Sequence, residues 1–132
     1  MPSPATSSPS ACATIGAVAG AGPAYVARFI AALAKAAKRQ GLSEELAGTI
    51  ALETVLGTAW MGAATSEDMG AIARRVASPN GTTEAGLAVL DRDDMLDELI
   101  RLTIDAAVRR GKELAQAAKG PGSRRTNGAK AP

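Results

Sequence analysis

The feature that most constrains the fold is a long stretch, residues 46–64, that is apolar on nearly every side of a helix. Its sequence is LAGTIALETVLGTAWMGAA, and Glu53 is its only charged residue. Ser43, followed by Glu44 and Glu45, indicates where this helix begins, because serine caps helix N-termini and acids favour the first turn. A helix without a polar face must be buried on every side or lie within a membrane.

Burial between subunits explains this stretch better than a membrane span does. A spanning helix needs about 20 predominantly apolar residues, whereas this one carries a central glutamate, several threonines and many alanines and glycines of low hydrophobicity. The 132-residue chain has only three aromatic residues, Tyr25, Phe29 and Trp60, and is rich in alanine, so one copy has little side-chain area for a core. Small helical chains of this kind often complete their core by oligomerising. We therefore predict self-association into a dimer or a higher oligomer, and no membrane partner.

The rest of the chain predicts further helices and no strand. Pro23 suits a first helical position and Gly41 suits a helix end, with apolar residues at helical spacing between them. Ser66 and the acids after it indicate another start, as do the acids near Asp93. The predicted class is all-α with about five helices, at residues 23–40, 44–64, 67–76, 83–90 and 91–118.

Composition predicts three parts. Residues 1–12 are rich in serine and proline, which indicates a disordered leader or a linker remnant, residues 13–118 form the helical domain, and residues 119–132 form a disordered basic tail. The tail holds 4 of the 15 basic residues and none of the 13 acidic ones, so residues 1–118 have 15 − 4 = 11 basic groups and a net charge of 11 − 13 = −2. A slightly acidic folded part with few aromatics predicts no nucleic-acid partner.

Two residue types exclude whole classes of chemistry. Histidine is absent and Cys12 is the only cysteine, which excludes histidine-based triads, histidine metal ligands and a disulfide or thiol metal site within one chain. We predict no metal site and a reducing, cytoplasmic location. Residues 11–21 could form the apolar core of a signal peptide, but no lysine or arginine precedes them, which argues against secretion.

The sharpest chemical signal is the sequence SPNGTT at residues 78–83. Proline presets φ, Asn80 tolerates a positive φ, Gly81 suits the exit, and Thr82 and Thr83 are predicted to supply N-cap hydroxyls. The first N–H groups of a helix have no intrahelical partner and lie at the positive end of its dipole, so this segment could hold a small anion such as a carboxylate. The alternative is a well-capped helix connection with no ligand, and spacing alone favours that alternative.

Three segments together resemble a known family. Residues 20–26, GAGPAYV, resemble the GSGPAY segment of pyrroline-5-carboxylate reductases, and residues 76–87, VASPNGTTEAGL, resemble their VTSPGGTTxAGL loop. Between these, residues 54–59, TVLGTA, match the family's TVLGAA. Order, spacing and helical context agree, and the resemblance covers residues 13–114.

The resemblance implies the family's all-α C-terminal domain, an interleaved dimeric helical bundle of the 6-phosphogluconate-dehydrogenase C-terminal-domain-like type. That domain supplies the subunit interface and substrate pocket of an enzyme that uses NAD(P)H to reduce 1-pyrroline-5-carboxylate, a small-molecule substrate, to proline. The resemblance implies that the amides of residues 81–83 hold the substrate carboxylate and that the Thr83 hydroxyl is catalytic, near the ring nitrogen. It assigns substrate binding to Ser78, Asn80, Gly81, Thr82 and Thr83, and places Gly22, Pro23 and Ala24 against the nicotinamide.

The chain also departs from the family pattern. Ala21 replaces a serine or cysteine, Asn80 replaces the first loop glycine, and Glu84 adds a negative charge beside the predicted anion site. No strand–glycine-loop–helix and no GxGxxG motif precede Ala13, so we expect no dinucleotide-binding domain here. Because half a site cannot orient a hydride donor, the chain alone is expected to show negligible reductase turnover.

Two functions stay open on this basis. The first is a dimerisation and substrate-binding domain that either complements a separate cofactor domain or was left by truncation. The second is a non-catalytic interaction module that pairs with full-length reductase subunits through the helix at residues 46–64. A small membrane-associated helical protein is a third and weaker interpretation.

Overall fold

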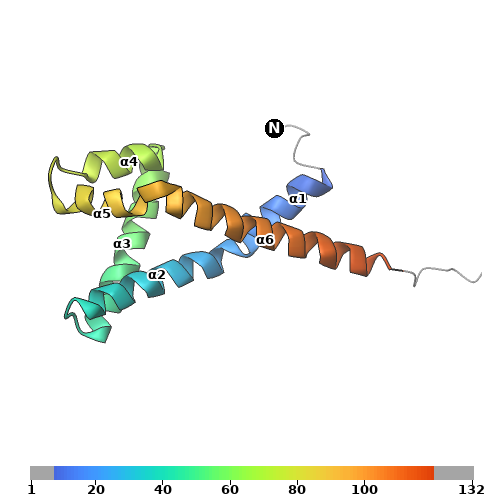
Figure 1. Ribbon diagram of the computed structural model, residues 1–132, viewed down its shortest axis with the longest axis horizontal. Coiled ribbons are helices and arrows are strands. Elements are labelled where there is room, and N and C mark those ends of the chain that lie inside the picture. The colour runs from blue at the N-terminus through green and yellow to red at the C-terminus, as the bar shows by residue number, and fades with distance from the viewer. Residues whose placement is uncertain (1–7, 121–132) are drawn as a thin grey trace, which may run out of the picture. The chain divides into compact units, whose positions relative to one another are not determined.

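The computed structural model describes residues 8–120, which contain helices and no strand (Figure 1). A π-helical segment, η2 (Gly16–Gly20), follows α1, and a short 3-10 segment, η3 (Arg92–Asp94), precedes α6. The six α-helices are α1 (Pro9–Ile15), α2 (Gly22–Arg39), α3 (Glu44–Thr65), α4 (Met69–Val76), α5 (Thr82–Leu90) and α6 (Met95–Ala118). Most of the predicted leader and tail, residues 1–7 and 121–132, lies outside the described residues.

The all-α class is confirmed, and the five predicted helices correspond to α2 through α6. Helix α1 was missed, because it begins at Pro9 inside the segment predicted as a disordered leader. The Ser8 hydroxyl accepts a hydrogen bond from the Ala11 N–H at 3.1 Å, and Pro9 stands in the first turn, where a missing N–H costs nothing. The leader prediction is therefore wrong for residues 9–12, since Ser-Pro is a helix start as well as a mark of low complexity.

The chain divides into two compact units. One consists of Met1–Ala21 with Arg101–Pro132, and its described part holds α1, η2 and most of α6. The other, Gly22–Ile100, holds α2 to α5 and the start of α6, and it contains every predicted site residue. Within this second unit, α2 and α3 make the most extensive contact between helices and are joined at one end by a tight turn (Figure 1).

Gly41 makes the turn between α2 and α3 possible. Its φ of +103° is unfavourable for any residue with a Cβ. After it, the Ser43 hydroxyl caps α3 by accepting from the Leu46 N–H at 3.2 Å, as predicted. Behind the turn, Ala47 and Ala51 of α3 are each only 1% exposed. These small side chains let the two helix backbones approach closely.

Very little else is buried in a single copy. Among residues 8–120 the buried apolar side chains are Ala17, Ala47, Ala51 and Ile72. Helix α3 leaves large side chains uncovered, including Leu56 at 59% and Trp60 at 71% exposure. The helix predicted to need burial on every side therefore exists, but most of its surface is not covered by its own chain.

A different stretch from the one considered in the sequence meets the simplest criteria for a membrane span. Residues Pro9–Arg39 form a helical stretch long and apolar enough to cross a bilayer by length and composition. Alanine and glycine supply much of that apolar character, and Arg28, Lys35, Lys38 and Arg39 lie in its second half. Because alanine and glycine partition weakly into lipid, contact with protein remains the better explanation.

Replacing Gly41 by alanine is expected to lower the free energy of unfolding by about 1 kcal/mol, because the positive φ strains a side chain. Gly41→Asn at the same position should cost less, since asparagine tolerates positive φ better. Thermal unfolding of the three proteins measures this. Equal melting temperatures for the alanine variant and the parent would contradict the role of the turn.

Candidate functional site

The candidate site is the turn between α4 and α5. Asn80 has a φ of +58°, the left-handed conformation predicted for it. The Gly81 N–H donates to the Ser78 carbonyl oxygen at 3.0 Å and closes the turn. A Cβ at Gly81 would lie 3.0 Å from that same oxygen, which is too close for an ordinary contact. Glycine is thus required by the tightness of the turn.

Helix α5 begins without a side-chain cap. Its N-cap is Gly81, and neither Thr82 nor Thr83 caps it with a hydroxyl, so that part of the prediction is wrong. The threonines stand inside the first turn instead, one and two positions after the N-cap. Within residues 8–120, the N–H groups of Thr82 and Thr83 have no protein acceptor, whereas the Ala85 N–H donates to the Gly81 carbonyl at 3.2 Å. Two of the amides predicted to bind a carboxylate are therefore available.

The other loop amides are already engaged. The Gly81 N–H bonds to Ser78, as described above, and the Asn80 N–H donates to the Glu84 carboxylate at 2.5 Å. Glu84 thus folds back onto the turn rather than pointing away from it. A carboxylate bound here would accept from the N–H groups of Thr82 and Thr83. The third amide predicted to bind it, that of Gly81, is already engaged.

The predicted site residues share one unit but are not all gathered in one place. Residues 78–83 are exposed or half-buried, so residues 8–120 of a single copy provide no enclosing walls around them. Gly22, Pro23 and Ala24 form the first turn of α2, and Figure 1 shows the start of α2 well away from the α4–α5 turn. A Cβ on Gly22 would meet no atom within 4 Å, so the space predicted for a nicotinamide is open.

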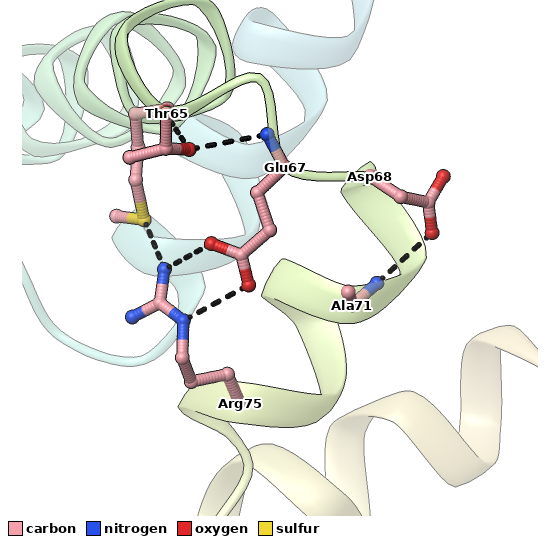
Figure 2. Close-up of polar contacts among 6 residues, drawn as sticks. Thr65, Glu67, Asp68, Ala71 and Arg75 are labelled. Atoms are coloured by element: carbon pink, nitrogen blue, oxygen red, sulfur yellow. Dashed lines mark hydrogen bonds and ion pairs between the residues drawn. The ribbon is translucent and has the colours of Figure 1, made fainter.

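An ion pair that the sequence analysis missed fastens α4, the helix that leads into the turn. Figure 2 shows Arg75 facing Glu67: Arg75 Nε lies 3.1 Å from Glu67 Oε1, and Arg75 Nη2 lies 3.0 Å from Glu67 Oε2. Nη2 also lies 3.2 Å from the Met61 sulfur on α3. The Glu67 side chain is only 28% exposed. The two-point ion pair joins the last turn of α4 to the segment between α3 and α4, and the sulfur contact joins the same arginine to α3.

Further polar contacts stabilise the connection between α3 and α4 (Figure 2). The Thr65 hydroxyl accepts from the Glu67 N–H at 3.3 Å, and the Asp68 carboxylate caps α4 by accepting from the Ala71 N–H at 3.1 Å. Ser66 ends α3 with a φ of +53°, and Ile72 is buried in the middle of α4. The residues just before the turn are thus held in place by contacts within the unit.

The ion pair shifts the titration of both partners. The hydrogen bonds from Arg75 lower the pKa of the Glu67 carboxyl, while the hydrogen bonds to Glu67 raise the pKa of Arg75. Arg75 stands in the last turn of α4. Its partner lies eight positions away and across a helix start, so no helical spacing rule would have found the pair.

Comparison with known proteins identifies the class of this helical unit and its turn. A family model described as pyrroline-5-carboxylate reductase dimerisation matches residues 9–114. The chain belongs to this family. The match includes α1 and reaches into α6, so it covers nearly all of the described residues.

Individual relatives agree. A pyrroline-5-carboxylate reductase from Synechocystis is 44% identical over 99 residues, covering 75% of this chain and 37% of the relative. One from Pseudomonas aeruginosa is 38% identical over 100 residues, covering 76% of this chain and 36% of the relative. The chain thus spans little more than a third of the length of these curated relatives.

Solved structures show the same fold. A pyrroline-5-carboxylate reductase from Coxiella burnetii aligns with a TM-score of 0.77 and 40% identity, covering 82% of this chain and 40% of that one. A pyrroline carboxylate reductase from Plasmodium falciparum, solved with NADP bound, aligns with a TM-score of 0.75 and 28% identity, covering 80% of this chain and 40% of that one.

Replacing Glu67 by glutamine should lower the melting temperature at neutral pH, because the ion pair is lost. The lowered pKa of Glu67 means that its stabilisation is present above the unfolded value of 4.5 and is lost as pH falls through the folded value. The gap between parent and variant should therefore close as the pH is lowered from about 7 to about 3. Glu113→Gln, in an exposed pair with Arg110, is the matched control and should have little effect at either pH. A gap independent of pH would contradict the assignment.

Proposed function

We propose that this chain is a self-associating, substrate-binding helical domain of a pyrroline-5-carboxylate reductase. It acts with an NAD(P)H-binding domain in the reduction of 1-pyrroline-5-carboxylate to proline. The names of its relatives support the reduction of pyrroline-5-carboxylate. One observation carries the self-association: in residues 8–120 only four side chains are apolar and buried, while nineteen large apolar side chains are exposed.

Energetics favour covering this surface. Full burial of one leucine-sized side chain is worth roughly 1.5–3 kcal/mol, and a whole domain is usually stable by only about 5–15 kcal/mol. Leaving so many large apolar groups in water therefore forfeits a stabilisation comparable to the total. Obligate dimers recover it with interfaces that resemble a domain core cut in half.

A groove in the Gly22–Ile100 unit supports the proposal that a second copy covers this surface. It lies along α2 and α3, has a volume of ≈ 550 Å³ and is walled mainly by apolar side chains, among them Phe29, Leu33 and Val55. A helix from a second copy has the size and apolar character to fill a groove of this kind. Alanine- and glycine-rich helices also permit the close backbone approach that interleaving requires.

The α4–α5 turn is the proposed substrate-binding element. Support comes from the open N–H groups of Thr82 and Thr83, which lie at the positive end of the α5 dipole and suit a carboxylate. The Thr83 hydroxyl would interact with the ring nitrogen, and Ser78 and Asn80 would maintain the turn. Because residues 78–83 are exposed or half-buried here, the remaining walls of the pocket would come from a second copy or from the cofactor domain.

The cofactor contact is proposed for Gly22, Pro23 and Ala24. NAD(P)H would supply the hydride, and the role of these residues would be to present a flat backbone surface to the nicotinamide. The open space around the Gly22 Cα is compatible with that approach. A small-molecule substrate, a cofactor domain and a cytoplasmic location remain predictions.

The same exposed faces suit a second candidate, a non-catalytic module that pairs with full-length reductase subunits. Nothing about an apolar groove requires its occupant to be an identical chain. Mixing the purified chain with a full-length reductase and measuring the subunit composition of the resulting species separates the two. Mixed oligomers would favour the module, and exclusive self-pairing would favour the domain.

Replacing Leu56 by aspartate is expected to shift the chain from dimer or higher oligomer to monomer and to lower its melting temperature. Leu56 is 59% exposed in one copy, so a charge there opposes association more than the folding of a single copy. Gln40→Asp, in the exposed α2–α3 turn, adds the same charge outside the apolar face and should leave association intact. Sedimentation equilibrium over a range of concentrations measures both. A parent chain that is monomeric at all concentrations would defeat the proposal.

The chain alone should form no proline above background from 1-pyrroline-5-carboxylate and NADPH. Residues 8–120 contain no strand, so they offer no nucleotide-binding sheet to orient the cofactor. A two-domain reductase assayed in parallel for NADPH oxidation and proline formation is the positive control. Proline formed at a comparable rate by the chain alone would show that a complete active site is present.

A further inference from the structure

Glu84 is placed so that the chain's own carboxylate accepts from the amide next to the predicted carboxylate site. It stands in the first turn of α5, and its Oε2 accepts from the Asn80 N–H at 2.5 Å, while Asn80 holds a φ of +58°. A glutamate three residues after an N-cap often reaches back to an amide near the helix start and stabilises it. Here the acceptor is a charged group, and the site it touches is the one proposed to bind a charged ligand.

The electrostatic consequence follows from this position. The open amides belong to Thr82 and Thr83, two and three residues after Asn80, the residue whose N–H donates to Glu84. An incoming carboxylate would gain from those amides and from the helix dipole, but it would be repelled by the Glu84 charge. Within residues 8–120, four basic side chains form ion pairs with carboxylates other than Glu84, so none of these pairs neutralises its charge. They are Lys38, Arg75, Arg101 and Arg110.

We propose that Glu84 is an internal competitor that weakens carboxylate binding at the α4–α5 turn. The inference rests on the proposed function, because it concerns the same turn. It assigns Glu84 a role in setting affinity and in favouring ligands that can displace its carboxylate from Asn80. A purely structural role, as a helix cap, predicts the opposite effect of removing its charge, since a less stable turn would bind less well.

Glutamine at this position separates the two roles. In Glu84→Gln the side-chain carbonyl can still accept from the Asn80 N–H, but the negative charge is gone. Glu84→Ala removes both the acceptor and the charge. The control, Glu113→Gln, removes the same charge from an exposed pair on α6, away from the turn.

The experiment is a titration of the full chain with L-proline, the product of the proposed reaction, followed by the amide resonances of Thr82 and Thr83. L-prolinamide, which lacks the carboxylate, is the matched probe. For Glu84→Gln we expect the affinity for proline to rise about fivefold, the factor that corresponds to ~1 kcal/mol of like-charge repulsion at close range in water. Affinity for prolinamide should be unchanged, and Glu113→Gln should behave like the parent.

The outcomes distinguish this inference from the function on which it rests. Proline that binds parent and Glu84→Gln equally, or binds the variant less tightly, would overturn the competitor role and leave the carboxylate site intact. Absence of proline-specific shifts at Thr82 and Thr83 in every protein, including Glu84→Ala, would overturn the carboxylate site itself and the competitor role with it. The Asn80 amide resonance reports whether the turn persists in each variant.

Discussion

The structure depends on the burial of apolar helix surface, and a single copy cannot bury that surface by itself. Residues 8–120 form six α-helices, yet most of their side chains are too small to enclose a core. Ala47 and Ala51 pack tightly behind the α2–α3 turn, whereas Leu56 and Trp60 on the same helix remain exposed. A helix of this composition is stable only where other protein surrounds it. Membership of a family described by its dimerisation agrees with that requirement.

Because few side chains are buried, short polar contacts fix the local geometry. The Glu67–Arg75 pair, reinforced by the Met61 sulfur and the Asp68 cap, fastens α4 to α3 and so positions the chain where it enters the α4–α5 turn. Such partly exposed contacts each contribute modest energy. These contacts matter because they fix the position of the turn. A turn that binds a ligand must hold its N–H groups in one orientation.

Much of this architecture was predictable from the residues. Start and stop signals such as Ser43 and Gly41 located the helices, and Asn80 was predicted to adopt the left-handed conformation it has. The prediction failed where one signal has two meanings. Ser8-Pro9 begins a helix although its composition is that of a linker. Thr82 and Thr83 lie within the first turn of α5, because Gly81, another residue common at N-caps, takes the cap position.

The sequence by itself determined the helical class, the order of the helices, the turn and the family, because these depend on local propensity and on patterns within a few residues. Only the tertiary structure decided that Arg75 pairs with Glu67, that Glu84 folds back onto Asn80 rather than outward, and which large side chains stay uncovered. Those outcomes depend on which rotamers packing permits and on contacts between residues that no helical period relates. Local patterns carry no information about either.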